Sequence, residues 1–185
     1  LSDGSHAFGA NALANDVNAI AIGFNSLANA VNAQAFGVNA EADAVNAAAY
    51  GVNATANAVN AVALGVNAEA TEVNAVAVGV NSSASAVNSL AFGVESFSNA
   101  TNASAIGVAS IANANNAVAL GVQSNADGIN STAIGSLSKA TDANSIAFGS
   151  TANSTKANSV AVGTLTTADG VNATAIGTDA GALAA

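Results

Sequence analysis

The feature that most constrains this chain is a glycine that recurs every fourteen residues without a slip, from Gly9 to Gly177. The residue two before each glycine is always Ala, and the residue directly before it is always large and apolar. Asn stands five before the glycine in twelve of the thirteen repeats, and Gly4 is the exception. A short fixed period without insertions is the signature of a solenoid, in which every coil is one copy of a small unit.

Each repeat is expected to form two short β-strands joined by two tight turns. Residues 61–66, Ala-Val-Ala-Leu-Gly-Val, alternate small and large with the period of two that strands show. Two heptads would also fit fourteen residues, but Gly, Asn and β-branched residues are poor helix formers, and the charges that flank a coiled-coil seam are missing. The sequence therefore predicts an all-β parallel roll.

Small residues mark the inside of the predicted roll. The positions four and two before each glycine, and three and five after it, are small almost throughout, so two sheets lined by them can approach closely. The column two before the glycine is expected inside the roll: Ala7, Ala21, Ala35, Ala49, Ala63, Ala77, Ala91, Ala105, Ala119, Ala133, Ala147, Ala161 and Ala175.

The large residue before each glycine then points outward and forms one continuous apolar stripe. Monomers do not normally expose apolar patches of that size, so a symmetric homo-oligomer is expected to cover the stripe around its axis. The residues of this stripe are Phe8, Ile22, Phe36, Tyr50, Leu64, Val78, Phe92, Ile106, Leu120, Ile134, Phe148, Val162 and Ile176.

Asn forms two further columns. The column five before the glycine should stack amide on amide at a turn, because Asn side chains bond along a stack and Asn tolerates left-handed conformations. Its members are Asn18, Asn32, Asn46, Asn60, Asn74, Asn88, Asn102, Asn116, Asn130, Asn144, Asn158 and Asn172. A second column, two after the glycine, is expected on the outward strand as a solvated ladder: Asn11, Asn25, Asn39, Asn53, Asn67 and Asn81.

Charge and composition exclude several classes of function. The net charge of −9 with only two Lys residues argues against binding to nucleic acid or to an anionic membrane surface. The chain has no Cys and a single His, His6, so no nucleophile–base pair is evident. The acids are not expected to form the close pair that glycoside hydrolysis requires. We expect no catalytic residues, no metal ligands and no cofactor.

Residues 144–149, Asn-Ser-Ile-Ala-Phe-Gly, and 158–163, Asn-Ser-Val-Ala-Val-Gly, resemble the head repeat of YadA-like trimeric autotransporter adhesins. The resemblance covers residues 5–178 and implies a left-handed parallel β-roll that assembles as a homotrimer. It also implies display at the bacterial cell surface, with outer-membrane anchoring through parts outside this chain, and a role in virulence. The early repeats depart from the pattern, because they have Ala where the later ones have Ser after the Asn.

The same resemblance implies attachment to a host extracellular matrix protein or cell-surface receptor, in some members collagen. The outward strand is the candidate contact surface, and Phe97, Ile111 and Leu137 are its candidate ligand contacts. Phe97 and Ile111 stand one coil apart and Leu137 follows in the neighbouring column, and such exposed, stacked apolar side chains are unusual. A passive spacer within a longer fibre is the alternative, and an ice-binding solenoid is a weaker one. Residues 1–178 are expected to form the head, and residues 179–185 the end of the head or a foreign tail without a neck.

Polar residues interrupt the apolar stripe three positions before the glycine, at His6, Gln34, Ser104, Thr132 and Thr174. Polar groups near a symmetry axis need partners, so a water or a small ion is expected to bridge three copies at some of these levels, and local hydrogen bonding is the alternative. The hydroxyl of Tyr50 is expected to reach water or backbone.

Overall fold

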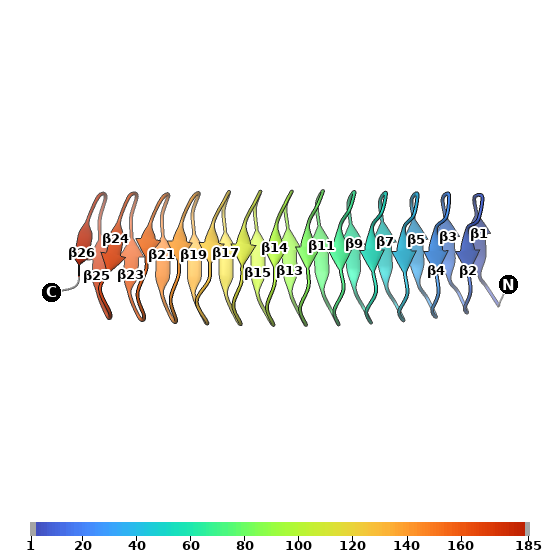
Figure 1. Ribbon diagram of the computed structural model, residues 1–185, viewed down its shortest axis with the longest axis horizontal. Coiled ribbons are helices and arrows are strands. Elements are labelled where there is room, and N and C mark those ends of the chain that lie inside the picture. The colour runs from blue at the N-terminus through green and yellow to red at the C-terminus, as the bar shows by residue number, and fades with distance from the viewer. Residues whose placement is uncertain (1–2, 184–185) are drawn as a thin grey trace. The chain divides into compact units, whose positions relative to one another are not determined.

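The computed structural model describes residues 3–183, and these residues form β-strands and turns. The chain divides into two units, with the boundary between Glu95 and Ser96. Each unit is a β-solenoid with coils of 14 residues, and a coil contributes one odd-numbered and one even-numbered strand (Figure 1). The prediction of an all-β solenoid is therefore confirmed.

The first unit contains two parallel sheets. One is formed by the odd-numbered strands β1 (His6–Phe8), β3 (Ile20–Ile22), β5 (Gln34–Phe36), β7 (Ala48–Tyr50), β9 (Val62–Leu64), β11 (Val76–Val78) and β13 (Leu90–Phe92). The other is formed by the even-numbered strands β2 (Leu13–Ala14), β4 (Leu27–Ala28), β6 (Glu41–Ala42), β8 (Thr55–Ala56), β10 (Glu69–Ala70) and β12 (Ser83–Ala84).

The second unit repeats this arrangement. Its even-numbered strands are β14 (Phe97–Ser98), β16 (Ile111–Ala112), β18 (Asn125–Ala126), β20 (Lys139–Ala140), β22 (Asn153–Ser154), β24 (Thr167–Asp169) and β26 (Gly181–Leu183). Its odd-numbered strands are β15 (Ser104–Ile106), β17 (Val118–Leu120), β19 (Thr132–Ile134), β21 (Ile146–Phe148), β23 (Val160–Val162) and β25 (Thr174–Ile176).

The register of the sheets places like residues beside one another. In the first unit Ala63 of β9 pairs with Ala77 of β11, fourteen residues later. In the second unit Ala119 pairs with Ala133 at the same offset. Every column of the sequence repeat is therefore a row of neighbouring side chains along the sheet, at the strand spacing of about 4.8 Å.

Both turns of the coil around Gly65 are β-turns with Val and Asn at their centre. Across residues 58–61 and 65–68, the fourth amide donates to the first carbonyl at 3.0 and 3.4 Å. Asn60 and Asn67, the third residues, have φ values of 59° and 54°. A type II turn requires a positive φ at that position, and Asn adopts it more readily than other residues with a side chain.

The interior of each unit is lined by Ala and Ser. The largest fully buried side chain among the described residues is that of Thr166, so the two sheets of a unit lie close together. Of the thirteen alanines expected inside, twelve are buried. Ala7 was predicted to be interior but is exposed, because no coil of the described residues covers the outer side of β1.

The C-terminal residues that the structure describes belong to the roll. Gly181–Leu183 forms β26 and pairs with β24 in the 14-residue register. These residues fall within 179–185, for which the end of the head was one of the two expectations. Residues 184 and 185 lie outside the described part.

Candidate functional site

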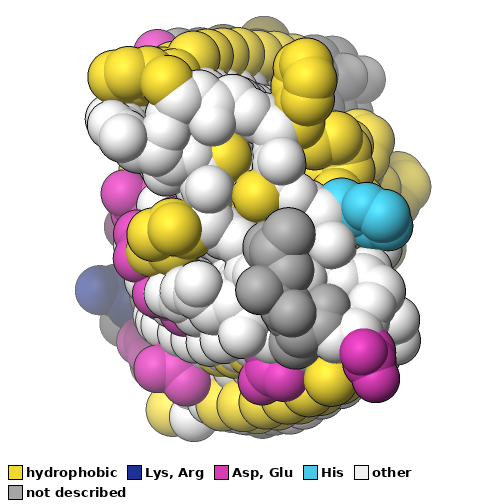
Figure 2. Space-filling view, turned by 90° about the vertical axis from the view of Figure 1, so that its right-hand side faces the viewer, with side chains coloured by type: hydrophobic (Ala, Val, Ile, Leu, Met, Phe, Trp, Pro, Cys, Tyr) yellow, Lys and Arg dark blue, Asp and Glu magenta, His cyan; other side chains and the backbone are white. Residues whose placement is uncertain are grey.

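Each unit presents two outward faces of different chemistry. The apolar face consists of the side chains one and three before each glycine, on the odd-numbered strands. The polar face consists of the side chains four and six after each glycine, on and just after the even-numbered strands. Figure 2, a view onto the N-terminal end, shows Asp and Glu side chains (magenta) down one side and along the lower edge, with hydrophobic side chains (yellow) on the upper part of the opposite side.

The apolar face carries no Asp, Glu or Lys in the described part of the chain. All thirteen residues of the predicted axis stripe lie on it, and each is half-buried or exposed in the single chain. The side chain of Phe92, for example, is 52% exposed, and that of Leu64 is 46% exposed. The face therefore leaves a row of bulky apolar groups uncovered.

One level of the apolar face contains a polar pair. The hydroxyl of Tyr50 on β7 donates to Oε1 of Gln34 on β5. The Tyr50 ring also stacks on Phe36, with centroids 4.9 Å apart and an angle of 11° between the ring planes. The hydroxyl thus bonds a side chain of the preceding coil, whereas we expected it to reach water or backbone. His6 lies at the exposed strand β1, at the N-terminal end of the same face.

The Asn column five before the glycine occupies one turn of each coil, where every member has a φ between 57° and 60°. Within each unit the side-chain amide of one Asn donates to the amide oxygen of the next, over 2.9–3.3 Å in the first unit and 3.0–3.2 Å in the second. Gly4 holds the equivalent position in the first coil, with φ of 73°. This column is a structural hydrogen-bond ladder.

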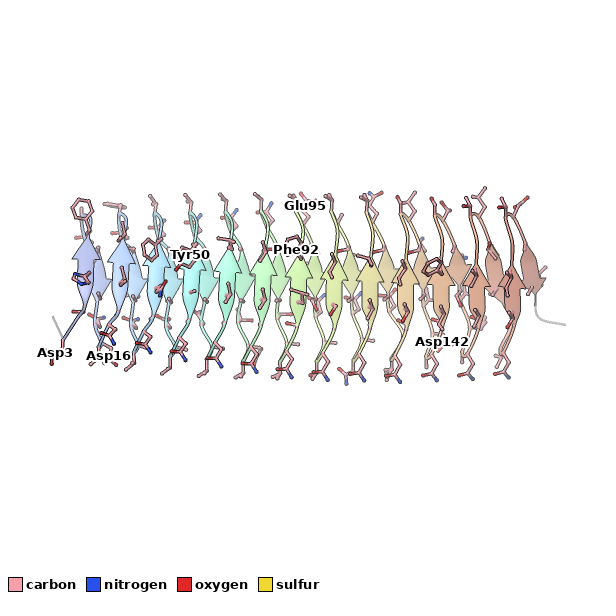
Figure 3. All side chains as sticks on the ribbon, turned by 180° about the vertical axis from the view of Figure 1, so that it is seen from behind. Asp3, Asp16, Tyr50, Phe92, Glu95 and Asp142 are labelled. Atoms are coloured by element: carbon pink, nitrogen blue, oxygen red, sulfur yellow. The ribbon has the colours of Figure 1, made fainter. Side chains whose placement is uncertain are left out.

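The second Asn column was assigned to the outward strand, and this assignment is wrong. Asn11 to Asn81 lie in the opposite turn with φ values of 54–58°, and they form their own amide ladder over 2.9–3.3 Å. Figure 3 shows the two rows of turns of the first unit, with Asp16 in one and Glu95 in the other. The missed signal is the triplet Val-Asn-Ala, which recurs seven residues apart at 59–61 and 66–68.

The candidate contacts Phe97, Ile111 and Leu137 do not form one group. Phe97 and Ile111 pair directly between β14 and β16, and both side chains lie on the polar face. Leu137 occupies a turn, with φ of 60° and 46% exposure. Asn125 and Lys139 follow Ile111 along its sheet, so the apolar pair is flanked by polar groups on that side.

Comparison with known proteins identifies the family. A family model described as a YadA head domain repeat (2 copies) matches residues 2–26, 42–68, 70–96, 98–124, 126–152 and 154–180. The chain belongs to the YadA head family. The crystal structure of the collagen-binding domain of the Yersinia adhesin YadA is 35% identical, over 58% of this chain and 68% of that chain, with a TM-score of 0.47. No curated protein matches the chain.

The polar face of this YadA head does contain one close acidic pair, contrary to the expectation from the sequence. Glu41 and Asp43 hydrogen-bond through their side chains, and this bond, partial burial and the charge of Asp43 together raise the pKa of Glu41. Asn29 donates to Asp43 at 2.7 Å. The two acids are neighbours on one side of a strand, two residues apart, a spacing that the fourteen-residue repeat does not reveal.

Residues 3–183 contain no group of three or more His, Asp or Glu side chains placed to hold a metal ion. The same residues enclose no pocket. None of their segments is a helix with the length and hydropathy needed to cross a membrane.

Proposed function

We propose that this chain is the head of a trimeric adhesin at the bacterial cell surface, where it attaches to a host extracellular matrix protein or cell-surface receptor. The observation that carries the proposal is the separation of chemistry between the two faces. One face is uncharged and exposes Phe, Leu and Ile side chains, and the other carries acids, amides and hydroxyls. A chain with two such faces has one side for its own copies and one side for partners.

The apolar face supports the trimer. Each unit exposes bulky apolar side chains on this face, for example Phe92 in the first unit and Phe148 in the second, both 52% exposed. Soluble monomers rarely leave an apolar patch of more than a few hundred Å² uncovered. Three copies related by a threefold axis, which runs parallel to the solenoid axes, cover all three faces at once. The family supplies the number three.

The polar face supports attachment. After trimer assembly this face still points outward, and it displays the same residues three times. Contacts that are weak one at a time gain avidity when three copies engage a repetitive matrix protein together. Phe97 and Ile111 are the best candidates for such contacts, because they are adjacent apolar groups and the column continues from Ile111 with the polar residues Asn125 and Lys139.

A binding measurement with matched variants tests the proposal. The purified trimer is applied to immobilised collagen, fibronectin and laminin and to host cells, alongside Phe97→Ser/Ile111→Ser. The control is Leu13→Ser/Leu27→Ser, because this pair lies in the same column of the polar face in the first unit. We expect saturable binding that only the Phe97/Ile111 variant loses.

The alternative outcomes separate the parts of the proposal. If the trimer binds no matrix protein or cell, the chain acts as a spacer and the adhesive role is wrong. If both variants retain binding, the attachment site is not this apolar pair. A monomer by sedimentation at micromolar concentration refutes the assembly.

A further inference from the structure

The polar pair on the apolar face suggests how the copies are aligned. A stack of similar coils presents nearly the same surface after a shift of one coil, about 4.8 Å. Apolar side chains alone discriminate weakly between such registers, whereas a single buried polar group in an apolar seam specifies one. A trimer of this chain therefore needs a level that differs from the others.

Gln34 and Tyr50 form such a level. They lie diagonally on neighbouring strands, because Gln34 pairs with Ala48 and Phe36 pairs with Tyr50. Ala48 is the smallest residue of its column, so the Gln34 side chain crosses above it to reach the Tyr50 hydroxyl. The stacking on Phe36 holds the Tyr50 ring in place.

This pair leaves hydrogen-bonding groups that the single chain does not use. Tyr50 donates its only proton to Oε1 of Gln34, so its oxygen can still accept. No group in residues 3–183 accepts a hydrogen bond from Nε2 of Gln34, whose two N–H groups remain donors. One donor group and one acceptor group are thus present at the same level of every copy.

The surroundings offer no other polar partner. The neighbouring residues of the apolar face are Ile20 and Ile22 on β3 and Val62 and Leu64 on β9. Once sister copies cover the face, an unpaired Gln34 amide would be buried without an acceptor, which is costly.

We infer that Gln34 and Tyr50 fix the axial register of the assembly, with Nε2 of Gln34 in one copy donating to the Tyr50 hydroxyl oxygen of the next. Three copies close this donor–acceptor relation into a ring, as a threefold axis requires. The Gln34 amide reaches the level of Tyr50, so a shift by one coil would take it away from the Tyr50 hydroxyl of the other copies. It would then lie beside their Val62 and Leu64 in one direction, or their Gln34 and Phe36 in the other. The inference rests on the proposed trimer and adds to it the residues that align the copies.

Cysteine cross-linking tests the register, because the chain has no native Cys. Val62→Cys is introduced into one chain and Leu90→Cys into another, and the two chains are expressed separately, one of them with an isotopic label. The two chains are then unfolded, mixed, refolded and oxidised. The two positions lie two coils apart on the apolar face, since Val62 pairs with Val76 and Val76 pairs with Leu90. In the correct register the introduced thiols are about 9.6 Å apart along the axis, too far for a disulfide, and a shift of one coil brings them within reach.

We expect the parent background to form disulfides between identical positions and none between a Val62→Cys chain and a Leu90→Cys chain. In the background Gln34→Leu/Tyr50→Phe, the disulfide between different levels should increase at least about tenfold, because the penalty for a buried, unpaired amide is gone. The trimer itself should persist in this variant, since replacing a buried polar pair by apolar groups is often neutral or stabilising. The matched control Ile20→Val/Ile22→Val changes two residues of the adjacent level without removing a polar group, and should match the parent.

Each outcome decides one question. A Gln34→Leu/Tyr50→Phe trimer that keeps a single register overturns the inference and leaves the trimer intact. A disulfide between the two levels in the parent background also overturns it, because a water or ion that satisfies Gln34 equally in every register would give this result. A parent chain that sediments as a monomer refutes the trimer and the inference together.

Discussion

Replacing Gly65 by Ala should separate two neighbouring coils of the first unit. A Cβ at this position would lie 2.4 Å from the carbonyl oxygen of Gly79 and 2.7 Å from its carbonyl carbon. Ordinary contact begins near 3.4 Å, so the next coil must move by about 1 Å. The φ of Gly65 is +142°, a conformation that residues with a side chain rarely adopt.

The expected cost follows from these two effects. The movement stretches the bonds from the Gly79 amide to the Leu64 carbonyl and from the Asn81 amide to the Val66 carbonyl, now 2.8 and 2.9 Å, beyond hydrogen-bonding distance. Two lost hydrogen bonds cost about 1–3 kcal/mol, and backbone strain costs about 1–3 kcal/mol. Gly65→Ala should therefore lower the free energy of unfolding by about 2–6 kcal/mol.

Two other glycines serve as controls. Gly177 has a φ of +124°, but its nearest atom to an added Cβ is 3.8 Å away, so Gly177→Ala should show the strain alone, about 1–3 kcal/mol. Gly181 has no atom within 4 Å of such a Cβ, and Gly181→Ala should be close to neutral.

Urea unfolding and hydrogen exchange measure these effects. Unfolding is followed at one protomer concentration for all variants, because the stability of an oligomer depends on concentration. Exchange of residues 76–84, followed by mass spectrometry, should accelerate in Gly65→Ala only. If Gly65→Ala is no more destabilised than Gly177→Ala and exchange in 76–84 is unchanged, the close approach of coils at the glycine column is wrong.

Three further predictions concern single side chains. Ser131 has a buried hydroxyl without a partner in the described residues, so Ser131→Ala should raise the free energy of unfolding in urea by about 1 kcal/mol. Ser154→Ala should lower it by a similar amount, because the Ser154 hydroxyl bonds the Ser159 carbonyl at 2.8 Å, and equal effects of the two changes would contradict the argument. Asn67→Ala should lower the Tm more than Asn67→Gly, since both lose the amide ladder but only Ala is strained at a φ of 54°. The raised pKa of Glu41 means that the folded chain retains a proton which the unfolded chain has released, so stability falls as pH rises from the usual Glu range through the raised value. Glu41→Gln should remove this part of the pH dependence in urea unfolding between about pH 4 and 7, and an unchanged slope would show that the pair does not hold the proton.

The sequence alone determined the architecture, because a fixed 14-residue period permits one spacing between coils and places like residues in rows. It also determined which columns are buried, since only small side chains fit between closely packed sheets. Ala63 could be placed inside from its column, and Phe92 could be placed outside from the alternation of its strand.

Only the tertiary structure decided where the turns fall and which side chains meet across neighbouring coils. Asn67 follows the alternation of a strand in sequence, but it lies in a turn, because a positive φ is not visible in a pattern of polar and apolar residues. The Tyr50–Gln34 bond joins diagonal neighbours, and the Glu41–Asp43 pair joins residues two apart on one side of a strand. Neither contact falls at the fourteen-residue spacing of the repeat. The period fixes the rows of the solenoid, whereas contacts between different rows depend on side-chain length and direction, which are set only when the coils are stacked.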